Sequence, residues 1–330
     1  MNHSSLQSHA AITAFGAYVP DKVLSNEDLA QMVDTNHDWI VQRTGIVERR
    51  IASDDQFCSD LCFKAVRNMQ SRYAVNLTDV DFVLVATTTP DTYFPSMSAR
   101  VQAEFGITNC GAVDIQAACS GFVAGLQLAN GLLLSGVHRK ILVIGAETLT
   151  KATDYTDRST CILFGDGAGA VLLERSEQGS FIGSYVSTNG SNGHHLYRSS
   201  LAPSIGDQPI LTNGMIVQNG REVYRWAVSN VPKGIKTILE QNHLAPDDID
   251  WFIPHSANMR IVESICEKTG IKLERTLTSM AQYGNTSAAS IPLAIDLALQ
   301  DSRIRAGDLV LLYGFGGGLT EAALLLRWTL

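Results

Sequence analysis

Three residues far apart in the sequence, Cys119, His255 and Asn285, have side chains that could form one catalytic site. A thiol is a potential nucleophile, and a histidine beside it is a frequent partner in covalent catalysis. Each residue also has an ordinary structural explanation, as a buried cysteine, a hydrogen-bonded histidine or an asparagine at a helix start. Their positions in the chain favour the catalytic interpretation.

Cys119 stands where a strand pattern passes through small residues into an amphipathic helix, in the segment AVDIQAACSGFVAGLQLANGLLLSG from Ala112. The spacing places the thiol at the helix start, where it faces free backbone N–H groups. Such donors and the helix dipole can lower a thiol pKa from about 8.5 into the range of about 3.5–7.5. We therefore expect a thiolate nucleophile near neutral pH.

His255 and Asn285 stand at the boundaries of predicted elements. His255 follows the strand pattern IDWFIP, and open α/β sheets usually bind ligands at the carboxyl ends of their strands. Asn285 follows Tyr283-Gly284 and opens a helical pattern. On position alone, Asn285 could be an N-cap and no more.

The chain repeats itself at a fixed shift. The segment LTDVDFVLVA from Leu77 resembles PDDIDWFIPH from Pro246, a shift of 169 residues (246 − 77). The segment KILVIGA from Lys140 matches LVLLYGF from Leu309 at the same shift. Two copies of about 150 residues fit a duplicated domain better than an array of short repeats. We therefore predict two similar halves related by a pseudo-twofold axis.

The repeat also relates the helix of Asn285 to the helix of Cys119. A shift of 169 residues places Asn285 on Gln116 (285 − 116), less than one helical turn before Cys119. The two helix starts should therefore meet near the pseudo-twofold axis and share an active site.

Short apolar runs alternate with longer helical patterns, which is typical of sheets covered by helices, so the predicted fold class is α/β. The polar stretch Glu174–Ser180 is the expected join. It divides the chain into an N-terminal half of residues 1–178, which bears the cysteine, and a C-terminal half of residues 179–330, which bears the histidine and asparagine. In the second half, one strand is expected at Leu277–Ser279.

Composition excludes several classes of protein. The 330 residues are 45% hydrophobic and carry a net charge of −8, which argues against a nucleic acid or an anionic membrane as partner. Six cysteines without a CxxC pair indicate reduced thiols in a cytosol. The polar N-terminus MNHSSLQSHA does not resemble a signal peptide, and no apolar stretch reaches the length of a membrane span. We expect a cytoplasmic protein without a metal site.

Several motifs together resemble the β-ketoacyl-acyl-carrier-protein synthase III family of the thiolase superfamily. They are DTNHDWIVQRTGIVERR from Asp34, FPSMSA from Phe94, AACSGF from Ala117, TDRST from Thr156, FGDGAGA from Phe164, PHSANMRI from Pro254, YGNTSAASIP from Tyr283 and FGGG from Phe315. The resemblance covers nearly the whole chain. It implies a thiolase-like fold of two duplicated α/β halves, layered αβαβα.

The resemblance also implies a reaction. Cys119 would take an acyl group from acyl-CoA and pass it to a carbanion made by decarboxylation of malonyl-acyl-carrier protein, with ping-pong kinetics. His255 and Asn285 would donate hydrogen bonds to the malonyl thioester oxygen, and the backbone N–H groups of Cys119 and Gly317 would form the oxyanion hole. No cofactor is expected, because acyl-CoA is a substrate.

Further binding residues follow from the same resemblance. Trp39 would stack on the adenine of coenzyme A, with Arg43 and Arg158 near the nucleotide end. Phe94 matches a residue that limits the acyl pocket from across a dimer interface, which implies a homodimer.

Carrier proteins are acidic, so this acidic chain needs a local basic face for docking. Arg221 and Arg225 are one helical turn apart, and Arg260 lies just beyond His255. We select Arg225 and Arg260 as the docking pair.

Alternatives remain open at the level of the sequence. A related condensing enzyme or acyltransferase of specialised metabolism would use the same three residues, and the preferred primer cannot be read from the motifs. A thiolase is disfavoured because the FGGG loop at Phe315 lacks a second cysteine. A silent subunit is disfavoured because Cys119, His255 and Asn285 are all present.

Overall fold

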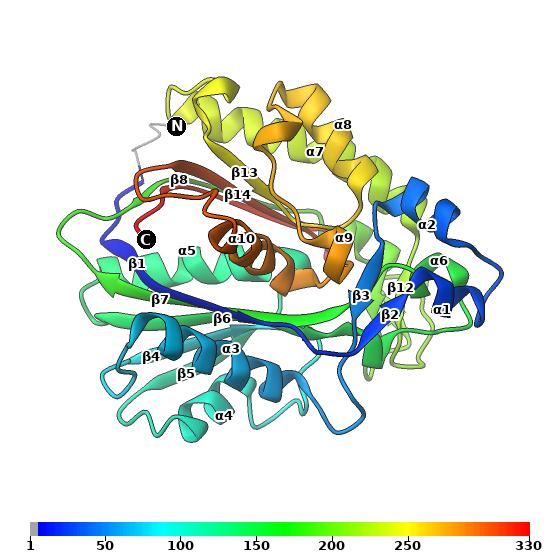
Figure 1. Ribbon diagram of the computed structural model, residues 1–330, viewed down its shortest axis with the longest axis horizontal. Coiled ribbons are helices and arrows are strands. Elements are labelled where there is room, and N and C mark those ends of the chain that lie inside the picture. The colour runs from blue at the N-terminus through cyan, green and yellow to red at the C-terminus, as the bar shows by residue number, and fades with distance from the viewer. Residues whose placement is uncertain (1–5) are drawn as a thin grey trace.

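Two β-sheets form the body of the computed structural model, which describes residues 6–330 (Figure 1). The first sheet has the order β1-β7-β6-β4-β5. Its strands are β1 (Ala10–Tyr18), β7 (Asp166–Arg175), β6 (Lys140–Thr148), β4 (Phe82–Ala86) and β5 (Gly111–Ile115). The second sheet has the order β8-β15-β14-β13. Its strands are β8 (Phe181–Thr188), β15 (Thr320–Arg327), β14 (Leu309–Gly316) and β13 (Trp251–Pro254).

Three layers of helices enclose the two sheets (Figure 1). The outer helices of the first sheet are α3 (Cys58–Tyr73) and α4 (Met97–Glu104), and those of the second sheet are α7 (Gly220–Gln241) and α8 (Met259–Thr269). Between the sheets lie α5 (Gly121–Leu134) and α10 (Ser290–Gln300). The order of layers is αβαβα, so the predicted fold class is confirmed.

The position of each element follows from its pattern of apolar residues. All nine residues of β6 are buried, as expected for a central strand covered by helices on both faces. Helices α5 and α10 are apolar on most of their surface. They can therefore lie between the two sheets and pack against both. Helix α8 instead buries a single apolar stripe, Ile261, Val262, Ile265 and Cys266, and leaves its other face in water.

Shorter elements lie at one end of the sheets. They are β2 (Val23–Ser25), α1 (Asn26–Ala30), α2 (His37–Thr44), β3 (Glu48–Arg50), α6 (Arg158–Cys161), β9 (Leu196–Arg198), β10 (Ser204–Ile205), β11 (Gln208–Pro209), β12 (Ile216–Gln218) and α9 (Met280–Tyr283). Strands β2 and β3 pair with each other, as do β9 and β12, and β10 and β11. None of these elements was expected from the sequence.

One predicted strand is wrong. Leu277–Ser279 forms no strand, and the chain here pairs with β13 only through an isolated parallel bridge between Thr276 and Phe252. The backbone of Ser279 already has helical dihedral angles and leads into α9 at Met280, so the extended conformation ends too early for a strand.

The repeat of the sequence is a repeat of the structure. Strand β13 begins 169 residues after β4 (251 − 82), β14 begins 169 after β6 (309 − 140), and α10 begins 169 after α5 (290 − 121). A 3₁₀ turn precedes each central helix, η1 (Ala118–Ser120) in the first half and η6 (Ser287–Ala289) in the second.

Both turns begin with a residue in the left-handed region, Ala118 with φ of 44° and Ser287 with φ of 47°. Non-glycine residues rarely adopt this conformation. The same tight elbow, here defined as residues 118–120 and 287–289, therefore occurs in each half.

Each elbow packs against a glycine in the central strand of the other half. A Cβ on Gly145 of β6 would lie 2.5 Å from the carbonyl oxygen of Ala288. A Cβ on Gly314 of β14 would lie 2.6 Å from the Cα of Ser120. Only glycine permits these approaches of backbone to backbone, and the two glycines are themselves 169 residues apart (314 − 145).

Residues 1–5, which hold half of the polar N-terminal segment used to exclude a signal peptide, lie outside the described residues. Within residues 6–330, no helix combines the length and the apolar character that crossing a membrane requires.

Gly145→Ala should destabilise the protein by about 1–3 kcal/mol, because the added methyl group overpacks a backbone contact that cannot relax. Urea unfolding followed by circular dichroism measures this change. Gly131→Ala is the matched control: Gly131 is exposed in α5, a Cβ added there would meet no atom within 4 Å, and alanine should stabilise the helix by up to about 1 kcal/mol. Equal stabilities of the two variants would contradict the packing argument.

Candidate active site

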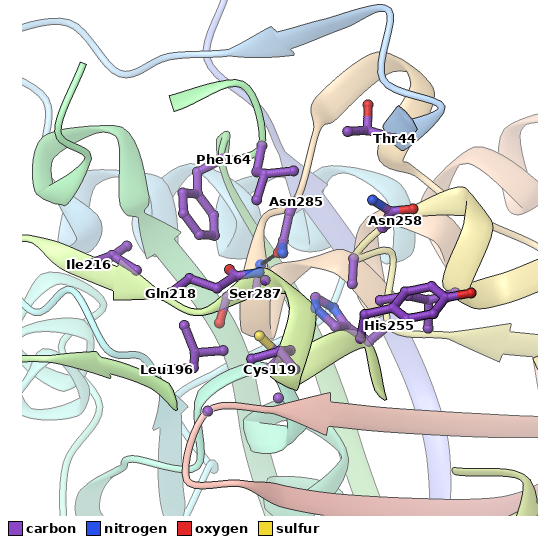
Figure 2. Close-up of a pocket in the computed structure, with 18 of the residues that line it drawn as sticks. Thr44, Cys119, Phe164, Leu196, Ile216, Gln218, His255, Asn258, Asn285 and Ser287 are labelled. Atoms are coloured by element: carbon purple, nitrogen blue, oxygen red, sulfur yellow. Dashed lines mark hydrogen bonds between the residues drawn. The ribbon is translucent and has the colours of Figure 1, made fainter. Parts of the chain in front are cut away.

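One pocket of about 570 Å³ contains Cys119, His255 and Asn285. Figure 2 shows the sulfur, the imidazole and the carboxamide directed toward the same space. Cys119 comes from the first elbow, His255 from the end of β13, and Asn285 from the residues just before the second elbow. The structure thus brings together the three residues that the repeat related.

The thiol of Cys119 is buried, with 8% of the residue exposed. Burial raises its pKa to about 12, although hydrogen bonds from Ser287 and the backbone of Gly317 act in the opposite direction. The expectation of a thiolate near neutral pH is therefore wrong for the protein without substrate. The cost of burying the charge exceeds the stabilisation by the helix start.

His255 is fixed by its neighbours and is 1% exposed. Its backbone N–H donates to the carbonyl of Tyr313 at 2.8 Å, and its ring packs edge-on against Phe315 with centroids 5.4 Å apart. Nδ1 lies 2.7 Å from Oγ of Ser290, which also accepts from the N–H of Ser256. Where the Ser290 hydroxyl donates to Nδ1, the ring carries its proton on Nε2.

Burial lowers the pKa of His255 to about 3, because a charged imidazole would lose its hydration. At neutral pH the ring is uncharged. With the proton on Nε2, it is a neutral hydrogen-bond donor.

Asn285 is held by the chain of the first half. Its backbone N–H donates to Leu163 at 2.8 Å, and its carbonyl accepts from Gly165 at 3.0 Å. Its side-chain Oδ1 accepts from the N–H of Ser287 at 2.9 Å. Because this bond engages the oxygen, the amide NH₂ is the part of the side chain that remains free to donate to a ligand.

Two backbone donors lie beside the sulfur. Gly317, in the turn between β14 and β15, lines the pocket, and its backbone N–H acts to lower the pKa of the Cys119 thiol. The N–H of Cys119 itself acts in the same direction. A carbonyl carbon bound to this sulfur would carry its oxygen near both donors.

Trp39 and Arg43 of α2 line the pocket, whereas Arg158 of α6 does not. The guanidinium carbons of Arg43 and Arg158 lie 5.7 Å and 5.2 Å from the centre of the Trp39 ring. Both distances fit cation–π contacts. Arg158 also donates to the carbonyl of Asp34 at 2.9 Å. All three residues predicted to bind coenzyme A therefore form one cluster.

The two arginines selected for docking differ in position. Arg260, at the start of α8, lines the pocket. Arg225 of α7 is exposed, forms an ion pair with Glu222 at 3.0 Å and does not line the pocket. Arg221 and Tyr224, on the same helix, line it instead.

Phe94 lies outside the pocket of its own chain. It is 86% exposed on the segment between β4 and α4, and no atom of it lines the cavity. Within a single chain, Phe94 therefore limits no acyl pocket.

Sequence reasoning missed several lining residues. Leu196 of β9, and Ile216 and Gln218 of β12, form one wall of the pocket (Figure 2). They belong to residues 189–219, between β8 and α7. The counterpart in the first half is residues 19–57, between β1 and α3, which also holds one pair of short strands, β2 and β3. The two connecting segments differ in length and sequence, so the repeat gave no signal for these lining residues.

The geometry defines a class of protein. Two α/β halves in five layers, with a cysteine on the first elbow, form a thiolase-like fold. Models of the 3-oxoacyl-[acyl-carrier-protein] synthase III family match residues 113–190 and, for its C-terminal part, residues 239–328.

Similar proteins cover nearly the whole chain. The β-ketoacyl-[acyl-carrier-protein] synthase III 2 of Halalkalibacterium halodurans is 56% identical over 323 residues, 98% of this chain and 97% of that protein. The protein of the same name from Bacillus anthracis is 55% identical over 98% of this chain and 100% of its own length. The crystal structure of the synthase III from Thermus thermophilus has a TM-score of 0.93 and 43% identity, covering 96% of this chain and 99% of that one.

The chain belongs to the 3-oxoacyl-[acyl-carrier-protein] synthase III family. It is an acyltransferase-type condensing enzyme of fatty-acid biosynthesis, as the resemblance of its motifs indicated.

The raised pKa of Cys119 predicts how the thiol reacts. Because only the thiolate is nucleophilic, alkylation of Cys119 by iodoacetamide should rise about tenfold per pH unit and continue to rise through about pH 9. Peptide mass spectrometry of the protein after timed alkylation measures the rate at this cysteine. A plateau at or below about pH 8 would show that the thiol ionises near neutrality, against the effect of burial.

Proposed function

We propose that the chain condenses an acyl-CoA primer with malonyl-acyl-carrier protein to give a 3-oxoacyl-carrier protein, using Cys119 as the nucleophile. The observation that carries this proposal is the presence of the buried residues Cys119, His255 and Asn285 in one pocket, with the backbone N–H groups of Gly317 and Cys119 beside the sulfur. Relatives named β-ketoacyl-[acyl-carrier-protein] synthase III at more than half identity support the choice of substrates.

In the first half-reaction, the sulfur of Cys119 attacks the thioester carbonyl of acyl-CoA. The backbone N–H groups of Cys119 and Gly317 donate to the oxygen as it gains negative charge. The carbon–sulfur bond to coenzyme A breaks, the acyl group stays on Cys119, and the thiol proton leaves with coenzyme A. No residue with a charge of its own is needed at the oxyanion.

In the second half-reaction, malonyl-carrier protein loses carbon dioxide, and the electron pair of the broken bond forms an enolate. Neutral His255 donates from Nε2, and Asn285 donates from its amide, to the enolate oxygen. The enolate carbon attacks the acyl carbonyl, the bond to Cys119 breaks, and the released thiolate takes up a proton from solvent. Because His255 and Asn285 are buried, these donors act with little competition from water.

The rim of the pocket supports recognition of both substrates. Trp39, Arg43 and Arg158 form the cluster that would hold the nucleotide of coenzyme A, with the indole against the adenine and the guanidinium groups near phosphate. Arg221 and Arg260 at the mouth, with Arg225 further out on α7, would form a basic face for the acidic carrier protein on an otherwise acidic molecule.

A homodimer is part of the proposal. Phe94 and its neighbour Tyr93 are 86% and 72% exposed, which is unusual for large apolar side chains on a monomer. The edge strand β5 beside them carries a third exposed apolar residue, Val113. A second copy covering this edge would bury these side chains, and Phe94 would then limit the acyl pocket of the partner.

The acyl-enzyme intermediate is directly measurable. After incubation with a panel of acyl-CoAs, the intact mass should increase by one acyl group, and addition of malonyl-carrier protein should remove the adduct with release of carbon dioxide. Cys119→Ala should abolish loading. Asn285→Ala should load but condense at least about a hundredfold more slowly, because one donor to the enolate is lost.

Discharge without carbon dioxide would instead indicate an acyltransferase, and failure of any acyl-CoA to load Cys119 would refute the proposed reaction. Unimpaired condensation by Asn285→Ala would refute the role of the amide.

Reversal of the rim charges should separate the two substrates. Arg225→Glu together with Arg260→Glu should raise the KM for malonyl-carrier protein about tenfold or more and leave acylation by acyl-CoA nearly unchanged. Lys236→Glu is the matched control, since Lys236 is an exposed cation of the same helix that pairs with Glu240 and does not line the pocket. Equal effects on both half-reactions would contradict carrier-protein docking at this face.

A further inference from the structure

The buried side chain of Arg49 carries a charge without a carboxylate partner. Arg49 is the middle residue of β3 and the first of the two arginines that end the motif from Asp34. It is 0% exposed, does not line the pocket and forms no ion pair among residues 6–330. Burial lowers its pKa to about 10, so the guanidinium is charged at neutral pH. Such a charge is costly unless hydrogen bonds replace its hydration.

The guanidinium of Arg49 donates to three oxygens. Nη2 donates to the carbonyl of Ile162 at 2.8 Å. Nη1 donates to Oδ1 of Asn26 at 2.9 Å and to the carbonyl of Leu24 at 3.1 Å. Asn26 is itself buried, and its NH₂ donates to the carbonyl of Ile46 at 2.9 Å, so its oxygen faces Arg49. The planar fork of an arginine suits several acceptors at once, and it joins β2 and α1 to the chain at Ile162.

Ile162 directly precedes the segment that holds the backbone of Asn285. The N–H of Asn285 donates to the carbonyl of Leu163 at 2.8 Å, and its carbonyl accepts from the N–H of Gly165 at 3.0 Å. Phe164 and Asn285 thereby form an isolated parallel bridge, and Figure 2 shows both residues at the pocket. Asn285 belongs to no helix or strand, so these two bonds hold its backbone in place.

The stem of Arg49 packs behind both segments of this bridge. A Cβ added to Gly165 would lie 3.1 Å from the Cβ of Arg49, and a Cβ added to Gly284 would lie at the same distance from it. Gly165 follows Phe164, and Gly284 precedes Asn285. The two glycines therefore permit the close approach of the arginine. One side chain thus contacts both segments and binds the chain that leads into one of them.

We propose that Arg49 is a positioning residue for Asn285: its guanidinium fixes residues 162–165, and these residues fix the backbone from which the Asn285 amide is directed at the enolate oxygen. The inference rests on the proposed function for the role of the amide. Asn285 acts only in the second half-reaction. Loss of Arg49 should therefore slow condensation much more than loading of Cys119.

The contact itself can be tested without a substrate. Arg49→Met removes every donor and keeps a side chain of similar length. It should speed hydrogen–deuterium exchange at the N–H groups of Gly165 and Asn285 about tenfold or more, because the bridge opens more often. Mass spectrometry of peptides that contain these residues measures the exchange. Unchanged exchange at both amides would overturn the inference.

Arg275→Met is the matched control. Arg275 also donates to backbone carbonyls, of Asp247 at 2.7 Å and Ile249 at 3.1 Å, but it lies outside the pocket. These bonds are made before the start of β13, whereas His255 follows its end. This variant should leave exchange at the bridge and both half-reactions unchanged.

The two half-reactions should respond differently to Arg49→Met. Loading of Cys119 by acyl-CoA should stay within about twofold of the unaltered protein, and condensation should slow about tenfold, because the Asn285 donor is misplaced. Intact mass measures loading, and release of carbon dioxide from malonyl-carrier protein measures condensation. Equal losses in the two half-reactions would show a general structural role and overturn the inference.

A double-mutant cycle shows whether Arg49 acts through Asn285. In the Asn285→Ala background, Arg49→Met should slow the remaining condensation by less than about twofold, since the amide that it positions is absent. A tenfold loss in both backgrounds would contradict this role. If Arg49→Met does not fold, Arg49→Lys takes its place in each measurement. Lysine keeps the charge but lacks the fork, so losses of several-fold are expected.

The outcomes separate this inference from the proposed function. Failure of any acyl-CoA to load the unaltered protein would refute the proposed function. Hydrogen exchange at the bridge would still support or overturn the contact between Arg49 and the segments that hold Asn285.

Discussion

The contact of two backbone elbows with the central strands of opposite halves is the constraint on which the site depends. Ala288 of the second elbow lies against Gly145, and Ser120 of the first lies against Gly314. These contacts place Cys119, on the first elbow, and Asn285, just before the second elbow, on the two sides of one pseudo-twofold axis. A side chain at either glycine would push the two halves apart. The catalytic arrangement is therefore a consequence of close packing between duplicated units.

Burial then gives the site its chemical character. The same low-polarity surroundings keep the Cys119 thiol protonated and the His255 imidazole neutral, so neither side chain is charged at neutral pH. Neutral donors at fixed positions are suited to an oxygen that becomes charged only during reaction, because they need no reorganisation at that moment. Glu147 of β6 is a further buried group, and burial raises its pKa, while hydrogen bonds from the Thr88 and Thr89 hydroxyls hold it in place.

Recognition is divided between the two ends of the pocket. The walls near Cys119 are apolar, with Leu196, Ile216 and Phe164 among them, which suits an acyl chain. Trp39, Arg43, Arg221 and Arg260 also line the pocket, and Arg158 lies against the Trp39 ring. Although the molecule has a net charge of −8, these arginines make the surroundings of the pocket basic, where anionic substrates would enter. Local placement of charge, rather than the total, decides which partners the surface attracts.

The sequence by itself determined the α/β class, the duplication and the long helices, because apolar periodicity and the 169-residue shift are local properties of the chain. It also named Cys119, His255 and Asn285 as candidates, since each stands at a boundary that the repeat makes equivalent. Only the tertiary structure decided the ionisation of Cys119, because desolvation depends on atoms from both halves.

Contacts between residues of distant segments could not be predicted from the sequence either. The exposure of Phe94, the place of Arg221 rather than Arg225 at the pocket and the bond from Ser287 to the Asn285 side chain all follow from how the chain packs in three dimensions. A pattern of residue types records which face of an element is buried. It does not record what covers that face, and the electrostatics of a buried site are set by what covers it.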